Sequence, residues 1–131
     1  MNSDKLVSGV TAFLADYTKA FNSNNGAEIA KLYNAPCLTV RGDGSIYCFQ
    51  SREEVERFFQ PYVEGLYREG CRNWRYSNLE VAPIGGRCVL ATMHWEPLRE
   101  DGTPLRKWRQ SYNLVRVDNA LRILVSTFHV D

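Results

Sequence analysis

A tyrosine, an asparagine and a histidine on separate predicted elements could together polarise a carbonyl group and move a proton. Tyr17 lies on the apolar stripe of a predicted N-terminal helix, and Asn113 and His94 lie on two predicted strands. A phenol and a carboxamide can each donate a hydrogen bond to a carbonyl oxygen. An imidazole can act as acid or base near neutral pH. From their residue types alone, these three residues are candidates for the polar groups of a small-ligand site; the alternative is a core tyrosine and a strand histidine bonded to its neighbours.

Two arginines are candidates for recognising a charged group on a ligand. Arg41 ends a predicted strand and Arg109 lies within another. A guanidinium group binds a carboxylate or a phosphate through two parallel hydrogen bonds. The alternative for Arg109 is that its side chain extends to the rim of the fold, where its charge stays in water.

The spacing of apolar residues predicts three helices and then a run of strands. Three- and four-residue steps predict a helix over 3–22, and a short second helix should stop at Pro36. Ser51 opens a capping box for the third helix, which should end at Gly70 and be kinked or divided by Pro61. The predicted strands are 37–41, 45–49, 73–81, 87–95, 105–117 and 121–130.

Short turns between the last four strands predict an antiparallel meander. The expected fold class is therefore α+β, with three N-terminal helices packed on one face of a bent antiparallel sheet. The length of 131 residues predicts a single domain over 1–131.

The turns also determine which strand residues share a face. A two-residue turn at 101–102 places Leu90 opposite Asn113, Thr92 opposite Ser111, and His94 opposite Arg109. A second turn, at 118–119, adds residues of the last strand to this face. The residues expected to point inward are Leu90, Thr92, His94, Arg109, Ser111, Asn113, Ser126 and Phe128.

The opposite face of the same strands is rich in aromatic residues. It should carry Met93, Trp95, Trp108, Gln110, Tyr112 and His129. An uncovered aromatic face is typical of a protein interface, so we expect Met93, Trp95, Trp108, Tyr112 and His129 to contact a protein partner.

Composition and charge exclude several classes of function. The net charge is +1, from 16 basic and 15 acidic residues, which argues against a nucleic-acid or anionic-membrane surface. No segment has the length and apolar character of a membrane span, and a cytoplasmic location is expected. The four cysteines lack a C-x-x-C spacing, and the two histidines are predicted on opposite faces, so no metal site is expected.

Several short segments resemble the nuclear-transport-factor-2-like (NTF2-like) superfamily, and within it the ketosteroid isomerase and SnoaL-like branch. The resemblance spans nearly the whole chain and implies a cone-shaped, cystatin-like fold whose sheet curls around the helices and encloses a ligand cavity. The segments are Ala15-Asp16-Tyr17, Leu32-Tyr33, Thr39-Val40, Arg52-Glu53 with Phe58-Phe59, and Val117-Asp118 with Arg122-Ile123.

The resemblance also implies roles for individual residues. Tyr17 matches the tyrosine that donates to the developing enolate oxygen in ketosteroid isomerase, and Asn113 falls where that enzyme keeps a protonated aspartic acid. The catalytic base of that enzyme is an aspartate on the first strand, where this chain has Arg41 or, in another matching, Gly42. Neither residue can act as a base, which counts against steroid-isomerase chemistry. Because family members commonly dimerise through the outer sheet face, a homodimer is expected.

The expected function is binding of a small, largely apolar, aromatic or polycyclic ligand in the cone, without a cofactor. One alternative is a cofactor-free isomerase, dehydratase or cyclase in which Tyr17 and Asn113 polarise a carbonyl and His94 is the acid or base. Another is a protein-interaction module acting through the outer face. The expected pocket consists of Tyr17, Tyr33, Arg41, Phe58, Phe59, Leu90, Thr92, His94, Arg109, Ser111, Asn113, Ser126 and Phe128.

Overall fold

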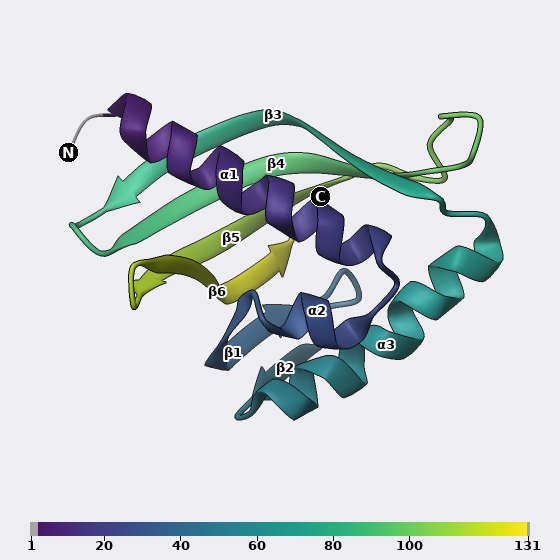
Figure 1. Ribbon diagram of the computed structural model, residues 1–131, viewed down its shortest axis with the longest axis horizontal. Coiled ribbons are helices and arrows are strands. Elements are labelled where there is room, and N and C mark those ends of the chain that lie inside the picture. Colours follow the sequence, from purple (N-terminus) through teal and green to yellow (C-terminus); the bar gives the residue numbers. More distant parts are fainter. Residues whose placement is uncertain (1–2, 131) are drawn as a thin grey trace.

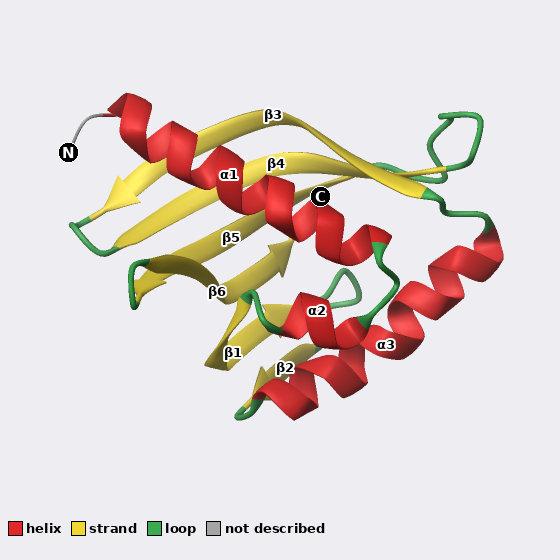
Figure 2. Cartoon of the chain, viewed as in Figure 1, coloured by secondary structure: helices red, strands yellow, loops and turns green. Residues whose placement is uncertain are grey.

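Three helices and six strands make up the computed structural model, which describes residues 3–130 (Figures 1 and 2). No helix in this described range is long and apolar enough to cross a membrane. The helices are α1 (Ser3–Asn22), α2 (Gly26–Ala30) and α3 (Arg52–Glu69). The strands are β1 (Tyr33–Val40), β2 (Ile46–Phe49), β3 (Asn73–Ile84), β4 (Cys88–Leu98), β5 (Trp108–Val117) and β6 (Ala120–Phe128).

All six strands form one sheet in the order β2-β1-β6-β5-β4-β3. Helix α1 runs across one face of the long strands, while α2 and α3 lie beside the shorter β1 and β2 (Figure 1). The α+β class with helices on one face of the sheet is confirmed. The expectation of a purely antiparallel sheet is wrong at one place, because β1 and β6 pair in parallel. These two strands are far apart in the sequence, so no hairpin constrains their relative direction.

Helix α3 begins and ends as its sequence predicts. The Ser51 Oγ accepts from the Glu54 N–H at 3.2 Å, and the Glu54 carboxylate accepts from the Ser51 N–H at 3.0 Å. Gly70 ends the helix in the left-handed region at φ 111°. The expected division at Pro61 is wrong, because the helix continues through it and buries Phe59 and Val63 on either side.

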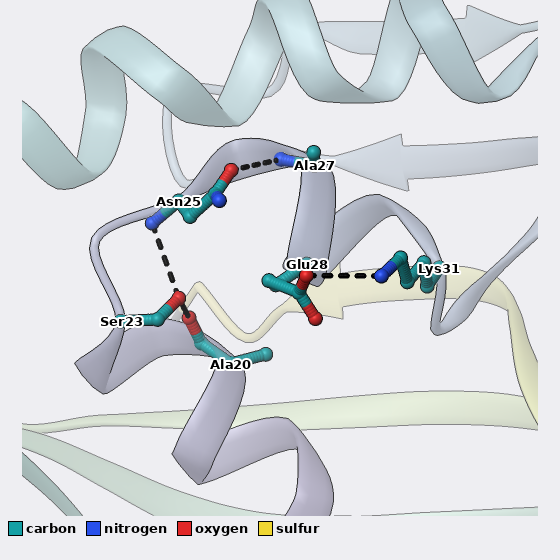
Figure 3. Close-up of polar contacts among 6 residues, drawn as sticks. All are labelled: Ala20, Ser23, Asn25, Ala27, Glu28 and Lys31. Atoms are coloured by element: carbon teal, nitrogen blue, oxygen red, sulfur yellow. Dashed lines mark hydrogen bonds and ion pairs between the residues drawn. The ribbon is translucent and has the colours of Figure 1, made fainter.

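The turn between α1 and α2 is held by short-range polar contacts (Figure 3). The Ser23 hydroxyl donates to the Ala20 carbonyl at 2.5 Å and accepts from the Asn25 N–H at 3.2 Å. The Asn25 side chain caps α2 by accepting from the Ala27 N–H at 3.0 Å. Helix α2 ends earlier than the expected stop at Pro36, which instead lies within β1.

Strands β4 and β5 pair in the predicted register, but the face of these strands that was predicted to point inward points outward. Leu90 lies opposite Asn113, Thr92 opposite Ser111, and His94 opposite Arg109, as expected. The residues on the helix side, however, are the alternating set Met93, Trp95, Trp108, Gln110 and Tyr112. The physical reason is that this second set is the more apolar, and its burial under the helices is favourable.

An extra residue in β6 changes its phase relative to β5. Leu114 lies opposite Ile123, whereas Asn113 lies opposite Val125, so Leu124 is a bulge. Ser126 and Phe128 consequently face inward with Tyr112, as predicted for them but for a different reason. His129, expected on the same face as Met93, instead meets the outward Ser111, with Nε2 and Oγ 2.7 Å apart.

A close approach between α2 and α3 generates a stability prediction. A Cβ atom at Gly26 would lie 2.8 Å from the backbone oxygen of Glu56 and 3.0 Å from the backbone nitrogen of Gln60. Gly26→Ala should therefore lower the free energy of unfolding by about 1–3 kcal/mol. Gly9→Ala is the matched control, because nothing lies within 4 Å of its added Cβ in α1. Urea denaturation should show that this control is stabilised by about 0.5–1 kcal/mol; equal effects of the two variants would contradict the packing argument.

Candidate functional site

An aromatic cavity lies between the helices and the inward face of the sheet. Its volume is about 20 Å³, which is room for one water molecule, because ring side chains fill the rest of the cone. The lining residues come from α1, α3 and five of the strands, and Arg41 directly follows β1. They are Tyr17, Phe21, Tyr33, Arg41, Phe59, Tyr62, Trp74, Trp95, Trp108, Gln110, Tyr112, Ser126 and Phe128.

The buried end of the cavity is built on a pair of phenols. The hydroxyls of Tyr17 on α1 and Tyr33 on β1 are hydrogen-bonded at 2.6 Å. The ring of Tyr17 packs edge-on against Tyr112 with centroids 5.5 Å apart, and lies 6.1 Å from the ring of Trp95. Tyr17 therefore ties the first helix to three strands of the sheet.

Burial governs the protonation of these phenols. Removal from water raises the pKa of Tyr17 and of Tyr112 well above the usual value of 10, and it raises the pKa of Tyr33 as well. Near neutral pH all three are uncharged hydroxyl groups. They can donate hydrogen bonds to a ligand but cannot act as proton acceptors of useful basicity.

Further polar groups lie along the sheet side of the cavity. The Trp108 indole N–H donates to the Gln110 side-chain oxygen at 2.8 Å, and the Gln110 amide donates to the Ser126 hydroxyl at 2.6 Å. The Trp95 indole nitrogen is different, because it has no hydrogen-bond partner of acceptable geometry among the described residues. It lies near enough to Tyr112 to oppose part of the burial-driven rise in that group's pKa. Leaving such a donor unpaired costs about 1–3 kcal/mol.

Arg41 forms the partly exposed end of the cavity. Its guanidinium carbon lies 4.4 Å from the ring centroid of Phe128, 5.1 Å from that of Phe58 and 5.2 Å from that of Tyr62. Cations are attracted to aromatic faces at these distances. Arg41 is the single charged residue among the described residues that line the cavity.

About half of the predicted pocket residues are brought together here. Tyr17, Tyr33, Arg41, Phe59, Ser126 and Phe128 line the cavity, and Phe58 contacts Arg41 beside it. The other predicted pocket residues lie on the outer face of the sheet. These are Leu90, Thr92, His94, Arg109, Ser111 and Asn113.

The expected catalytic set does not assemble. Asn113 lies between the inward Tyr112 and Leu114, so strict alternation turns it away from Tyr17, and the expectation that these two meet is wrong. His94 also points outward, where its Nδ1 accepts from the Asn78 amide at 3.1 Å. Arg109 is likewise outside and forms an exposed ion pair with Glu80 at 3.1 Å.

The predicted partner surface is corrected in the same way. Met93, Trp95, Trp108 and Tyr112 lie on the inward side of the sheet and cannot form an outer interface, while His129 lies outside. The sequence contained the signal for this assignment, since a face with two tryptophans, a methionine and a tyrosine is the more favourable one to bury. Seven lining residues were absent from the predicted pocket. Four of them had been expected on the opposite face of the sheet, namely Trp95, Trp108, Gln110 and Tyr112, and the other three lie on apolar positions of their elements: Phe21, Tyr62 and Trp74.

The lining can bind hydrogen-bond acceptors but lacks a proton-transfer group. Among the described residues that line the cavity, none is a carboxylate or an imidazole. The polar groups present are phenols, indoles, an amide, a hydroxyl and a guanidinium. This chemistry can hold and polarise a ligand oxygen, whereas proton abstraction from carbon needs a base within reach.

The buried phenol pair generates a prediction about stability. Tyr17→Phe deprives the Tyr33 hydroxyl of its partner and should lower the free energy of unfolding by about 1–2 kcal/mol at pH 7. Tyr17→Phe with Tyr33→Phe should cost less than the sum of the single variants, because no unpaired hydroxyl remains. Strictly additive costs in urea denaturation would contradict the hydrogen bond.

The same pair predicts how stability depends on pH. The folded-state pKa of each phenol lies above its unfolded value of about 10, so the stabilisation is complete below pH 10 and is lost as pH rises further. Each such phenol should add about 1.4 kcal/mol per pH unit to the alkaline loss of stability. Tyr17→Phe should therefore flatten the loss between about pH 10 and 11.5 relative to the unchanged chain, as measured by urea denaturation at each pH.

Comparisons with known proteins agree with this architecture. A family model described as NTF2-like protein (DUF6841) matches residues 4–130. The fold is similar to that of Aln2 from a Streptomyces species, with a TM-score of 0.82 at 17% identity, covering 100% of this chain and 94% of that one. A search of curated proteins finds no match.

Two further structures extend the likeness. One is an NTF2-like protein with a cystatin-like fold from Novosphingobium aromaticivorans, with a TM-score of 0.77 at 14% identity, covering 96% of this chain and 82% of that one. The other is an NTF2-like protein of unknown function from Shewanella oneidensis MR-1, with a TM-score of 0.73 at 12% identity, covering 93% and 97%. At such identities the likeness shows the fold alone. The family match spans almost the entire chain, and the protein therefore belongs to the NTF2-like family DUF6841.

Proposed function

We propose that the chain binds a small planar aromatic molecule in this cavity, with a hydrogen-bond acceptor of the ligand directed at the buried end. The observation that carries the proposal is the unpaired Trp95 N–H, which is almost fully buried in the cavity wall beside the phenols of Tyr17 and Tyr112. Buried polar groups in proteins are nearly always paired, so an unpaired donor on a residue of the cavity wall suits a ligand oxygen.

The shape of the walls supports an aromatic ligand. Ring faces and edges surround the cavity, and the Trp108 and Phe128 rings at its open end are stacked with centroids 5.4 Å apart. Such walls favour a flat apolar body with a few polar groups. The ligand is expected to be no larger than one or two fused rings, because the present volume of about 20 Å³ must first expand.

The open end is where that expansion costs least. Trp108 is the first residue of β5 and Phe128 the last of β6, and both are partly exposed, unlike the fully enclosed Tyr17 and Tyr33. Rotamer changes at a binding site are common even where the backbone stays still. We infer that these two rings move apart to admit the ligand.

Binding is favoured over turnover for this chain. A cofactor-free isomerase or dehydratase needs an acid or base beside the reacting carbon, and the described lining offers only neutral donors and one guanidinium. The Trp95 N–H, together with whichever of Tyr17 and Tyr33 does not donate within their pair, could stabilise a ligand that already carries an oxyanion. The supported role is therefore recognition of a carbonyl- or oxyanion-bearing aromatic molecule.

Acetophenone, a flat ring with one acceptor, is a direct probe of this proposal. Each of the three tryptophans of the chain lines the cavity, so each indole N–H signal in a ¹H–¹⁵N correlation spectrum reports on it. We expect saturable shifts, largest for Trp95, with a Kd on the order of a millimolar or tighter. Cyclohexyl methyl ketone, which keeps the acceptor but lacks the flat ring, should bind more weakly.

Substitution of Trp95 tests whether its indole N–H is the group that donates a hydrogen bond to the ligand. Trp95→Phe should weaken acetophenone binding by about 2- to 10-fold, the contribution of one hydrogen bond. Tyr67→Phe is the control, because Tyr67 lies outside the cavity with its ring against Arg72. Absence of any shift at about 10 mM acetophenone, an excess over the expected Kd, or equal binding of the two ketones, would contradict the proposal.

We also propose that the outer face of the sheet pairs with a second copy of the chain. The middle of this face is uncharged, and its residues include the exposed Leu38 together with Val125 and Asn113 beside it. Two identical uncharged surfaces can meet about a two-fold axis without repulsion between like charges.

Light scattering should accordingly give twice the 15.0 kDa mass of one chain. Val125→Glu would place like charges close together across the two-fold axis and should yield monomers. Val7→Glu, the same change on the exposed side of α1, should leave the dimer intact. A monomeric unmodified chain at about 100 µM, well above the Kd of a stable dimer, would exclude this pairing.

A further inference from the structure

We propose that the ligand is an aromatic carboxylate whose anionic group is held by Arg41 at the open end of the cavity. This inference rests on the proposed function and specifies the class of ligand. The first observation is that the guanidinium group packs against three aromatic rings, those of Phe58, Tyr62 and Phe128, whose centroids lie 4.4–5.2 Å from its central carbon. A guanidinium fixed in this way loses little conformational freedom when it binds an anion.

The second observation is that Arg41 lacks an anionic partner in the protein. Arg75, Arg106 and Arg109 each form an ion pair with a glutamate, but no carboxylate of the described residues lies within ion-pair distance of Arg41. The acidic residue nearest in sequence, Asp43, accepts hydrogen bonds from the backbone and hydroxyl of Ser45 at 2.9 and 2.6 Å. These hydrogen bonds are the main cause that lowers the pKa of Asp43, and Arg41 adds only a weaker attraction without forming an ion pair.

The third observation is that the rest of the cavity is complementary to negative charge. The described lining contains no carboxylate. The Trp95 N–H and one hydroxyl of the Tyr17–Tyr33 pair can donate to a ligand, because the other hydroxyl proton is used within the pair. The positive charge of Arg41 also reaches the buried end: burial raises the pKa of Tyr33, and Arg41 acts in the opposite direction. An anion inside the cavity would thus interact with one cation and several donors, whereas a cationic ligand would be repelled.

A carboxylate fits this position better than a phosphate. The two parallel N–H groups of a guanidinium match the planar carboxylate, and a carboxylate attached to a ring can lie in the ring's plane between flat aromatic walls. A tetrahedral phosphate dianion is bulkier and more strongly hydrated, so it would lose more on entering a site walled by Phe58 and Phe128. Three probes that carry one ring each can be compared: benzoate with a carboxylate, phenyl phosphate with a phosphate, and acetophenone with an uncharged carbonyl group.

Benzoate and acetophenone share the ring and the carbonyl carbon and differ in one oxygen against one methyl group. The single polar group of benzoate tests the Arg41 end of the cavity, and that of acetophenone tests the buried end. Isothermal titration calorimetry of the unmodified chain near neutral pH should give benzoate at least tenfold tighter binding than acetophenone. Arg41→Gln should reduce benzoate affinity by at least tenfold and acetophenone affinity by less than threefold. Arg41→Lys should retain part of the benzoate affinity, since it keeps the charge but loses the two-pronged geometry.

Arg109→Gln is the control for the change in net charge. Its guanidinium lies on the outer face in an exposed ion pair with Glu80, so its loss should leave the benzoate affinity within twofold of the unmodified chain. A structural role of Arg41 in holding the rings would instead reduce the binding of both probes equally in Arg41→Gln.

The outcomes separate the two proposals. Acetophenone binding as tightly as benzoate, or equal losses for both in Arg41→Gln, would overturn the carboxylate assignment and leave the proposed function standing. Phenyl phosphate binding more tightly than benzoate through Arg41 would also overturn it, in favour of a phosphate. Failure of every probe to bind would remove the proposed function as well. The comparison of probes on the unmodified chain needs no variant, so a folding defect in Arg41→Gln cannot obscure the result.

Discussion

The aromatic side of β4 and β5 has to be shielded from water, and the rest of the structure follows from that requirement. Burying an aromatic side chain such as Trp95 or Tyr112 contributes about 2–3 kcal/mol relative to leaving it exposed. Helix α1 supplies the cover through Tyr17, whose ring contacts both. Because side chains alternate along a strand, turning this face inward places His94 and Asn113 on the other side. One packing requirement thus creates the cavity and removes two candidate catalytic groups from it.

The sequence alone was sufficient to predict the class of fold and much of the pairing register between the strands. Turn positions fixed Leu90 opposite Asn113, and the capping box at Ser51 fixed the start of α3. The alternation of side chains along a strand indicates which residues share a face of the sheet, but it does not indicate which of the two faces the helices cover. The apolar character of the Trp95 side decides that question, because burying this face is more favourable than burying the polar face that carries His94 and Asn113. The bulge at Leu124 has no clear local signal, because a single extra residue leaves the pattern of the strand almost unchanged.

The candidate site was only partly predictable for a related physical reason. Periodicity placed Tyr17 on the inward stripe of its helix, and the family resemblance matched Arg41, which directly follows β1, to a site position. The volume of the cavity depends on the way in which bulky ring side chains from five strands and two helices pack together. No local sequence pattern specifies this packing. The parallel pairing of β1 with β6 is likewise a long-range event. Even so, this pairing places Tyr33 and Arg41 beside Ser126 and Phe128 and so completes the wall.

The cavity combines features that do not favour stability alone. An unpaired indole N–H at Trp95 and a cation at Arg41 without a carboxylate both carry a free-energy cost that a purely structural core would avoid by apolar substitution. Such departures from well-paired packing are typical of binding sites, where a ligand supplies the missing partner. The phenols of Tyr17 and Tyr33 are already paired with each other and stay neutral, so they give the site rigidity rather than reactivity. The proposed binding of an aromatic anion rests on this combination of a rigid buried end and a ring-flanked cation at the other end.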